Sequence, residues 1–204
     1  MRATMRHLPL AALLLATACA HGGPRAGAAA EAAPADRAAA PADYFPLAVG
    51  NAWVWEDQSP GRPAGQAAAS RTVRILERTA DGFFRDSERG ELRASGECLR
   101  DRVRQLLCRP LAVGTTWKSV VAVSSTERYE IVGAGERVET PAGRFEGCLR
   151  VRSVNAAGSG ADLVAEITYA PGVGPVRIET FAVAGGKAAP QLKALLKSYH
   201  LEGK

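Results

Sequence analysis

Short runs of residues that alternate between apolar and polar positions recur along the chain from Tyr44 onward. The pattern is clear in the segments 73–75, 149–153, 163–169 and 176–178. A period of two places successive side chains on opposite faces of a strand, so each run buries one face and exposes the other. Half-buried strands of this kind are typical of antiparallel sheets.

Turn sequences separate these runs at short intervals. Pro and Gly stand together at 141–143 and 171–172, and two Gly residues at 185–186, where they favour tight turns. We therefore predict an all-β or nearly all-β domain of about 9–11 antiparallel strands, built as a strongly curved sheet, an open barrel or a sandwich. Residues 191–197 have a helical pattern, so at most one short helix is expected near the C-terminus. The same residues could instead lead into a last strand at 198–201.

The first 18 residues have the build of a secretory signal peptide. Two arginines form a positive n-region, and an apolar run over residues 8–15 ends in the small residues Ala16-Thr17-Ala18. A run of this length is too short to span a bilayer. We expect residues 1–18 to be removed by cleavage between Ala18 and Cys19.

Cys19, placed directly after these small residues, resembles the lipobox cysteine of bacterial lipoproteins, which is acylated and becomes the N-terminus. Ala16 stands where the lipobox usually has Leu, and an ordinary secreted protein that begins with a free cysteine is the alternative. We predict lipid attachment at Cys19, so that acyl chains hold the exported protein on the membrane of the cell envelope. In lipoproteins of enterobacteria an Asp after the cysteine favours the inner membrane. Ala20 occupies that position here, which favours the outer membrane.

Residues 19–43 are predicted to combine this lipid-attachment cysteine with a tether. Twelve of the 23 residues from 20 to 42 are Ala, with Pro and Gly spaced among them. The stretch has no large apolar residue to pack into a core. All 12 aromatic residues lie at or after Tyr44, so we predict a single β-rich domain over residues 44–204.

Four segments of this domain carry a resemblance to other proteins. They are residues 44–53 (YFPLAVGNAW), 110–117 (PLAVGTTW), 140–151 (TPAGRFEGCLRV) and 169–176 (YAPGVGPV). In this order they resemble a broad group of uncharacterised bacterial envelope lipoproteins with YFPLxxGNxW, PAGxFxxC and YAPGVG segments. The resemblance implies a cell-envelope location and carries over no catalytic residue. A looser resemblance, to periplasmic carrier proteins, implies a curved antiparallel sheet or an open barrel.

Residues for common catalytic chemistry are scarce in the predicted domain. His200 is its only histidine, so we expect neither a Ser-His-Asp nor a Cys-His nucleophile and predict a non-enzymatic domain. The cysteines of the domain and His200 lack the paired spacing of a zinc site, so no metal or cofactor is expected. The alternative is a carboxylate-based hydrolase of envelope glycans that uses two of Asp57, Glu88, Glu130 and Glu166.

The pairing of the three cysteines in the domain is open at this point. Cys98 and Cys108 could close a loop in an oxidising export compartment. One extended strand over 99–107 would hold them about 30 Å apart, so this pairing needs a turn that the sequence does not indicate. A pairing of Cys148 with either of them is equally consistent with the sequence. At least one thiol stays free, and we expect Cys148 to be a small buried hydrophobic residue.

Tryptophan and arginine each allow a structural and a binding interpretation. Trp53 and Trp55 share one face of a predicted strand, and with Trp117 we expect them to anchor the core; the alternative is stacking on a ligand. Arginines recur on the predicted strand faces and could form a basic stripe for anionic lipid or an acidic partner. We favour a solvated face, because Asp and Glu are interspersed and the net charge is only +5. Nucleic acid is not an expected partner outside the cytoplasm.

Together these features predict a membrane-anchored lipoprotein of the bacterial envelope. Its β-domain would bind a partner protein, or a lipid or other apolar ligand, within the curved sheet. The alternatives are the carboxylate-based hydrolase and a purely structural subunit of the envelope.

Overall fold

The computed structural model describes residues 39–61, 67–156 and 160–203, which belong to one compact unit, Ala38–Lys204. Ala18, Cys19 and most of the predicted tether lie outside the described residues, as does the predicted signal peptide. No helix in the described part of the chain is long and apolar enough to cross a membrane.

The described residues form one 3-10 helix and twelve strands. In chain order they are η1 (Pro41–Tyr44), β1 (Ala52–Asp57), β2 (Ser70–Arg78), β3 (Phe84–Asp86), β4 (Glu91–Ala94), β5 (Cys98–Arg100), β6 (Gln105–Cys108), β7 (Thr116–Ala122), β8 (Ser125–Thr140), β9 (Gly143–Ala156), β10 (Ala161–Ala170), β11 (Gly174–Ala184) and β12 (Lys187–His200). The prediction of an all-β, antiparallel domain is confirmed, with one strand more than the expected upper number.

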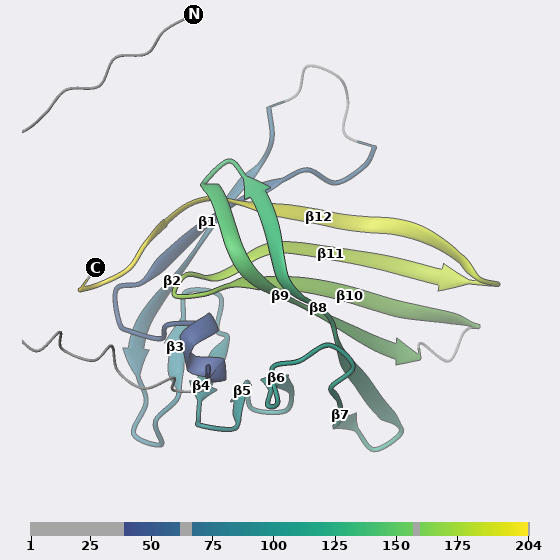
Figure 1. The fold of residues 1–204 in the computed structure, drawn as a ribbon, viewed down its shortest axis with the longest axis horizontal. Coiled ribbons are helices and arrows are strands. Elements are labelled where there is room, and N and C mark those ends of the chain that lie inside the picture. Colours follow the sequence, from purple (N-terminus) through teal and green to yellow (C-terminus); the bar gives the residue numbers. More distant parts are fainter. Residues whose placement is uncertain (1–38, 62–66, 157–159, 204) are drawn as a thin grey trace, which may run out of the picture. The chain divides into compact units, whose positions relative to one another are not determined.

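All twelve strands belong to one sheet, in the order β6-β5-β4-β3-β2-β1-β12-β11-β10-β9-β8-β7. Strands that follow one another in the chain lie side by side within two meanders, β1 to β6 and β7 to β12. The first and last strands join the two meanders, because Ala52 in β1 pairs with His200 in β12. The edge strands are then β6 and β7, and the curvature of the sheet brings them close to each other (Figure 1).

Side chains close the seam between the two edge strands. The indole N–H of Trp117 in β7 donates to the carbonyl of Gln105 in β6 at 2.6 Å, and the backbone N–H of Gln105 donates to Ser119 Oγ at 2.9 Å. These bonds satisfy backbone groups that an exposed edge strand leaves open. The sheet is therefore nearly closed and barrel-shaped.

The long hairpin of β8 and β9 bends across the sheet. The pairing register shifts near Gly133 and Glu136, and such irregularities bend the strand that contains them. In Figure 1 the tip of the hairpin crosses β12, and the N–H of Ala142 at this tip donates to the carbonyl of Leu196 at 3.0 Å. The hairpin thus covers part of the core.

Two clusters of buried side chains fill the interior. The first contains Trp53, Trp55, Ile75, Val138, Phe145, Cys148, Ala170, Val173, Val176, Ala194, Leu196 and Leu201. The second contains Leu99, Leu107, Tyr129, Ile131, Leu149, Val151 and Tyr169. Phe45 and Leu47, which follow η1, pack against both clusters, so the start of the domain links them.

Of the two expectations for residues 191–197, the helix is wrong and the last strand is confirmed, because these residues lie inside β12. Alanine, leucine and lysine favour a helix locally. Here β1 and β11 flank the segment and supply hydrogen-bond partners on both sides. Ala194 and Leu196 are then buried in the first cluster. Tertiary pairing thus overrides local propensity.

The single extended strand over residues 99–107, which would have held Cys98 and Cys108 apart, is not formed. Residues 101–104 form a turn between β5 and β6. The carboxylate of Asp101 accepts hydrogen bonds from the backbone N–H groups of Val103 and Arg104. An Asp that accepts a hydrogen bond from the backbone two residues ahead is a recognised turn signal. Sequence inspection did not single out Asp101 for this role.

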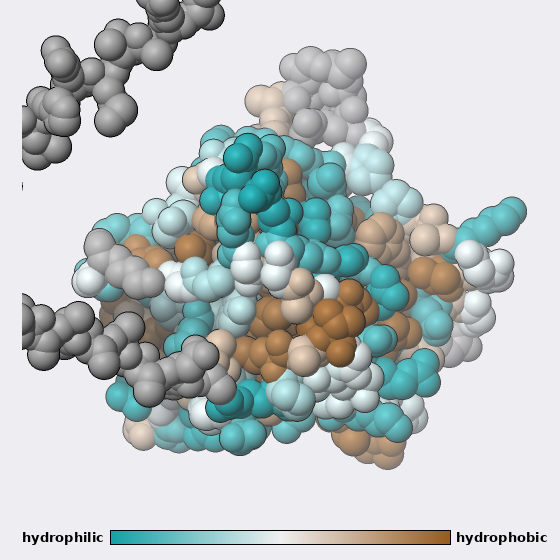
Figure 2. All heavy atoms as spheres, viewed as in Figure 1, coloured by the Kyte–Doolittle hydropathy of each residue, from teal (hydrophilic) through white to brown (hydrophobic). Residues whose placement is uncertain are grey.

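The outer surface mixes charged side chains with small apolar areas. Figure 2 shows hydrophilic side chains over much of the viewed face, with one apolar area near its middle and another over the turn between β7 and β8. Val120 and Val123, at this turn, are exposed. Scattered apolar residues of this kind are normal on a folded domain.

Candidate functional site

The inner face of the sheet carries the second core cluster. Along strands β8 to β12 the side chains on this face change in size and polarity. Three successive rows of cross-strand neighbours show the change. They are Ile131-Val151-Ile167-Ile178-Ala194, then Tyr129-Ser153-Ala165-Thr180-Leu192, then Glu127-Asn155-Leu163-Ala182-Ala189. The side chains become smaller and more polar from the first row to the third, so they fill the interior less completely.

Two adjoining hollows lie on this face. The Glu127 hollow has a volume of about 540 Å³ and is lined by Arg104, Glu127, Ser153, Asn155, Leu163, Val164, Ala165, Thr180, Phe181 and Gln191. The Trp55 hollow has a volume of about 260 Å³ and is lined by Trp55, Asp57, Ala69, Ser70, Arg71, Ile178, Leu192 and Ala194. Thr180 of the first and Leu192 of the second are cross-strand partners, which places the hollows side by side.

The carboxylate of Glu127 is the best-connected polar group of the site. It accepts hydrogen bonds from Arg104 Nε at 3.0 and 3.2 Å, from Asn155 Nδ2 at 3.3 Å and from the hydroxyl of Tyr129. Only 8% of the Glu127 residue surface is exposed. A buried carboxylate with this many donors is held in one position.

Burial by itself would raise the pKa of Glu127. The hydrogen bonds from Tyr129 and Arg104 outweigh that effect and hold the pKa below its ordinary value of 4.5. The pKa of Tyr129 is raised, first by burial and then by its bond to the carboxylate. At neutral pH the site therefore contains an ionised carboxylate, a guanidinium and a neutral phenol.

We expect Glu127→Gln to lower the free energy of unfolding by about 1–2 kcal/mol at pH 7, because a neutral amide replaces the buried carboxylate that accepts hydrogen bonds from Arg104, Tyr129 and Asn155. The folded-state pKa of Glu127 lies below its unfolded value, so its contribution is present above about pH 4.5 and is lost as the pH falls through the folded pKa. Urea unfolding at pH 7 and pH 3 measures both effects.

The matched control is Glu139→Gln, which removes a carboxylate paired with Arg144 on the exposed surface. Such a pair contributes less than about 1 kcal/mol. Equal losses in the two variants at pH 7 would contradict a structural role for the Glu127 network.

The three tryptophans singled out in the sequence lie in different places. Trp53 is a core residue outside both hollows. Trp55 is also buried, with 4% of its surface exposed, yet one side of it forms the wall of the Trp55 hollow. Trp117 stacks on Tyr129, with ring centroids 5.5 Å apart and planes 9° from parallel, and so connects the seam to the Glu127 network.

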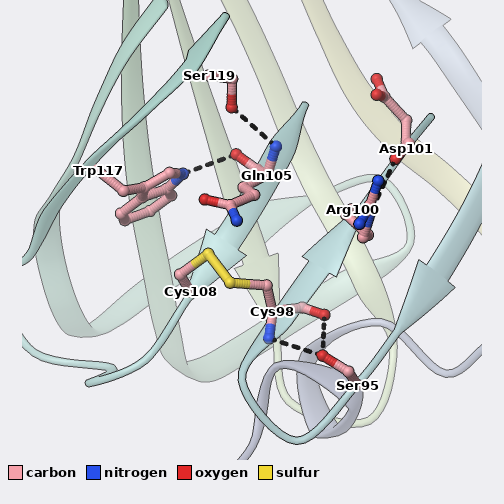
Figure 3. The surroundings of a disulfide bond; sticks show 8 residues. All are labelled: Ser95, Cys98, Arg100, Asp101, Gln105, Cys108, Trp117 and Ser119. Atoms are coloured by element: carbon pink, nitrogen blue, oxygen red, sulfur yellow. Dashed lines mark hydrogen bonds between the residues drawn. A yellow bond between two sulfur atoms is a disulfide. The ribbon is translucent and has the colours of Figure 1, made fainter. Parts of the chain in front are cut away.

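Cys98 and Cys108 form a disulfide bond that joins β5 to β6 (Figure 3). The turn that brings the two strands together is the Asp101 turn. Gln105, at the start of β6, makes the seam contacts with Trp117 and Ser119 that Figure 3 shows beside the disulfide. The disulfide therefore links the short edge strand β6 covalently to β5, next to the contacts through which β6 meets β7.

Cys148 is a free cysteine and is fully buried in the first core cluster. Burial first, and then the nearby charge of Glu136, raise the pKa of its thiol to about 11. We therefore expect iodoacetamide to leave Cys148 unmodified at pH 7.5 in the folded protein and to alkylate it in urea, as measured by mass spectrometry. Rapid alkylation of the native protein would contradict this arrangement.

The four carboxylates considered for a hydrolase do not share one site. Asp57 lines the Trp55 hollow on the inner face. Glu130 and Glu166 lie on the opposite face, on either side of Arg152 in β9. Glu88 forms an ion pair with Arg71 at 3.2 Å. The four therefore do not converge on one site, and Glu130 and Glu166 are the two that share a face.

The pKa of Glu166 also differs from that of a general acid. Burial would raise its pKa, but hydrogen bonds from Arg152 and Arg150 outweigh burial and lower it. A carboxyl group that donates a proton near neutral pH needs a raised pKa.

Among the described residues no group of three or more His, Cys, Asp or Glu side chains could hold a metal ion.

Ion pairs neutralise many of the arginines that recur on the strand faces. The partners in the structure are Glu88 for Arg71, Asp81 and Glu91 for Arg102, Asp101 and Glu127 for Arg104, Glu136 and Glu166 for Arg150, and Glu166 for Arg152. Mixed pairing of this kind supports the solvated face over a continuous basic stripe.

The fold and the hollows define the class of this domain: an up-and-down antiparallel β-sheet, nearly closed, with a partly unfilled interior. Among solved structures, the chain is similar to a protein from Bacteroides fragilis described as exported, with a YmcC-like fold; the TM-score is 0.48 and the identity 16%, over 78% of this chain and 99% of that one. It is also similar to a protein from Parabacteroides distasonis described as a lipoprotein, with a TM-score of 0.44 and 12% identity over 77% and 98% of the two chains. No protein-family model and no curated protein matches the chain.

The sequence analysis did not identify Glu127 as a site residue, although the position of this residue in the strand pattern could have indicated it. Glu127, Tyr129 and Ile131 occupy alternate positions of one strand, so the charged residue lies on the apolar face. A carboxylate in such a position has to find partners inside the sheet. The partners themselves come from β9 and from the β5–β6 turn, which only the tertiary structure brings together.

Proposed function

We propose that the protein is an exported bacterial lipoprotein, anchored in the outer membrane through an acylated Cys19, whose β-domain binds a lipid or similar amphiphile in the two adjoining hollows. The sequence features of residues 1–43 support the anchor. The binding role is supported by one observation above all: an apolar hollow lies beside a hollow that contains a fixed ion pair. The domain would act by binding and not by catalysis.

The Trp55 hollow suits the apolar part of such a ligand. Trp55, Ile178 and Leu192 are the large apolar residues of its wall, and burial of a hydrocarbon chain there gains about 25 cal/mol per Å² of apolar surface. The Glu127 hollow alone falls within the range of about 300–1,000 Å³ that is usual for small-molecule sites.

The Glu127 hollow suits the polar part of the ligand. Its lining includes the side chains of Ser153, Asn155 and Thr180, which offer neutral donors and acceptors. Arg104 is half-exposed, with its Nε on Glu127 and its Nη1 3.7 Å from the carboxylate of Asp101, so the N–H groups of Nη2 remain to reach a ligand oxygen. The expected ligand is an acyl chain with a neutral or anionic head.

The binding test uses the mature protein and a short-chain lysophosphatidylcholine kept below its critical micelle concentration. We expect saturable binding, followed by a change in tryptophan emission because Trp55 forms the wall of the hollow. Leu192→Glu should weaken binding at least tenfold by placing a charge on that wall. The matched control, Leu76→Glu, changes a leucine of β2 that is 53% exposed and lies next to the inward-facing Ile75. Its affinity should equal that of the unmodified protein.

Two results would overturn the binding proposal. One is the absence of lipid both in the titration and in native mass spectrometry of the protein as purified. The other is unchanged affinity in Leu192→Glu. Turnover of a cell-wall glycan that is lost on substitution of one carboxylate would instead support the hydrolase. Crosslinking to a stable neighbour, without any ligand, would support a structural subunit.

The anchor is tested separately by metabolic labelling with palmitate and by membrane fractionation. We expect label in the wild-type protein, enriched with the outer membrane, and no label in Cys19→Ala. Mature protein that is unlabelled and freely soluble would contradict acylation and would leave the ligand-binding result unaffected.

A further inference from the structure

A third hollow, separate from the proposed ligand site, lies between the start of the domain and strands β2 to β4. It has a volume of about 400 Å³ and shares no lining residue with the Trp55 or Glu127 hollow. Phe45, Leu47 and Phe84 form its apolar wall, and Arg78 and Arg93 bring two guanidinium groups to it. We name it the Arg78–Arg93 pocket.

Neither arginine has a carboxylate partner among the described residues. The side chain of Arg78 makes no hydrogen bond or ion pair with them, and the side chain of Arg93 makes one long hydrogen bond, 3.4 Å from its Nη1 to the backbone carbonyl of Asp81. Asp81 also lines the pocket, and its carboxylate is engaged by Arg102 and Thr79. The hydrogen bond from Arg102, followed by that from Thr79, lowers the pKa of Asp81.

Aromatic rings hold both guanidinium groups from one side. The guanidinium carbon of Arg78 lies 5.6 Å from the centroid of Phe84, and that of Arg93 lies 4.8 Å from the centroid of Phe83. Stacking of this kind fixes the plane of a guanidinium while its N–H edge remains able to donate. That edge matches the oxygen pairs of carboxylate and phosphate groups.

Gly82 lies beside both arginines. Its φ is +82°, and a Cβ placed on it would lie 3.8 Å from Arg78 Nη2 and 4.0 Å from Arg93 Cδ. The glycine serves the turn through its positive φ, and its position shows that the two arginine side chains approach the same point of the pocket lining.

We propose that the Arg78–Arg93 pocket binds an anionic group, a phosphate or a carboxylate, that is carried on an apolar chain or ring. Two arginines without a carboxylate partner would supply the charge and the donors. The wall of Phe45, Leu47 and Phe84 would cover the apolar part. The proposal does not depend on the ligand of the other two hollows, since the pockets have no residue in common.

Calorimetric titration of the mature protein in low salt tests this site. The probes are decyl phosphate and inorganic phosphate, with octyl glucoside as the uncharged amphiphile, each below its critical micelle concentration. We expect decyl phosphate to bind at least tenfold more tightly than either of the others, and its affinity to fall as salt is added. Equal affinity for inorganic phosphate would overturn the proposal, because the apolar wall would then contribute nothing.

The variants Arg78→Gln and Arg93→Gln locate the binding. Each should weaken decyl phosphate binding about tenfold, and the double variant at least fiftyfold. Arg128→Gln is the matched control, since Arg128 is an exposed arginine of β8 outside this pocket, and Leu192→Glu tests the other hollows. Near-ultraviolet circular dichroism establishes that each variant is folded. Unchanged affinity in the folded double variant, or loss of binding in Leu192→Glu, would contradict the assignment.

Discussion

Replacing Trp53 by alanine is expected to lower the free energy of unfolding by about 4 kcal/mol and the melting temperature by about 8–16 °C. Trp53 is only 2% exposed, and its ring packs edge-to-face on Phe45 at a centroid distance of 5.0 Å. Its indole N–H also donates to the carbonyl of Val173 at 2.8 Å. The substitution therefore creates a cavity and leaves a buried carbonyl without its donor.

The variant Trp53→Phe separates these two effects. It keeps most of the apolar volume but removes the N–H, so we expect a loss of about 1–2 kcal/mol. Urea unfolding measures both variants, and an unchanged m-value would show that the exposed area on unfolding is the same. A loss below about 1 kcal/mol in Trp53→Ala would contradict the central position of this residue, since surface substitutions change stability by only about 0.5 kcal/mol.

Removing the disulfide with Cys98→Ala and Cys108→Ala is expected to lower the free energy of unfolding by about 3 kcal/mol. The bond closes a short loop, with a sequence separation of 10, and the entropy of the open chain sets this magnitude. The loss should be accompanied by loosening of the seam, because Leu99 and Leu107 beside the two cysteines are fully buried in the second core cluster.

Reduction with dithiothreitol provides the matched experiment. It should destabilise the wild-type protein by about the same amount and leave the double variant unchanged, which thermal unfolding monitored by circular dichroism can show. Cys148→Ala, which removes the free thiol instead, should keep the response to the reductant. An unchanged melting temperature of the wild-type protein in the presence of the reductant would exclude a stabilising disulfide.

The predictable part of the fold is the part that local chemistry determines. Period-two alternation follows from the geometry of a strand, and Gly and Pro mark turns because they permit or impose special backbone angles. These signals indicated the all-β class and the antiparallel hairpins. They failed at residues 191–197, where alanine, leucine and lysine suit a helix locally and a central strand only when β1 and β11 are present.

The candidate sites depend on residues that the sequence keeps apart. Glu127 meets Arg104 and Asn155 only because β8, β9 and the β5–β6 turn face one another. Arg78 and Arg93 meet at Gly82 only because β2 and β4 flank β3. No local pattern encodes these distances, so the hollows could not have been located from the sequence, even though the tendency of the chain to form a curved sheet could.

The pairing of β1 with β12 has a consequence for the order in which the domain is completed. Ala52 and His200 are partners, so the ladder that joins the two meanders connects residues separated by almost the whole domain. Contacts of such large sequence separation form slowly, because a long stretch of chain must first be brought together. Synthesis delivers β1 first and β12 last, and until β12 arrives β1 can pair on one side only. The sheet is therefore complete only after β12 has paired with β1. Deleting the last residues of β12 would remove part of this ladder and open the sheet at its centre and not at its edge.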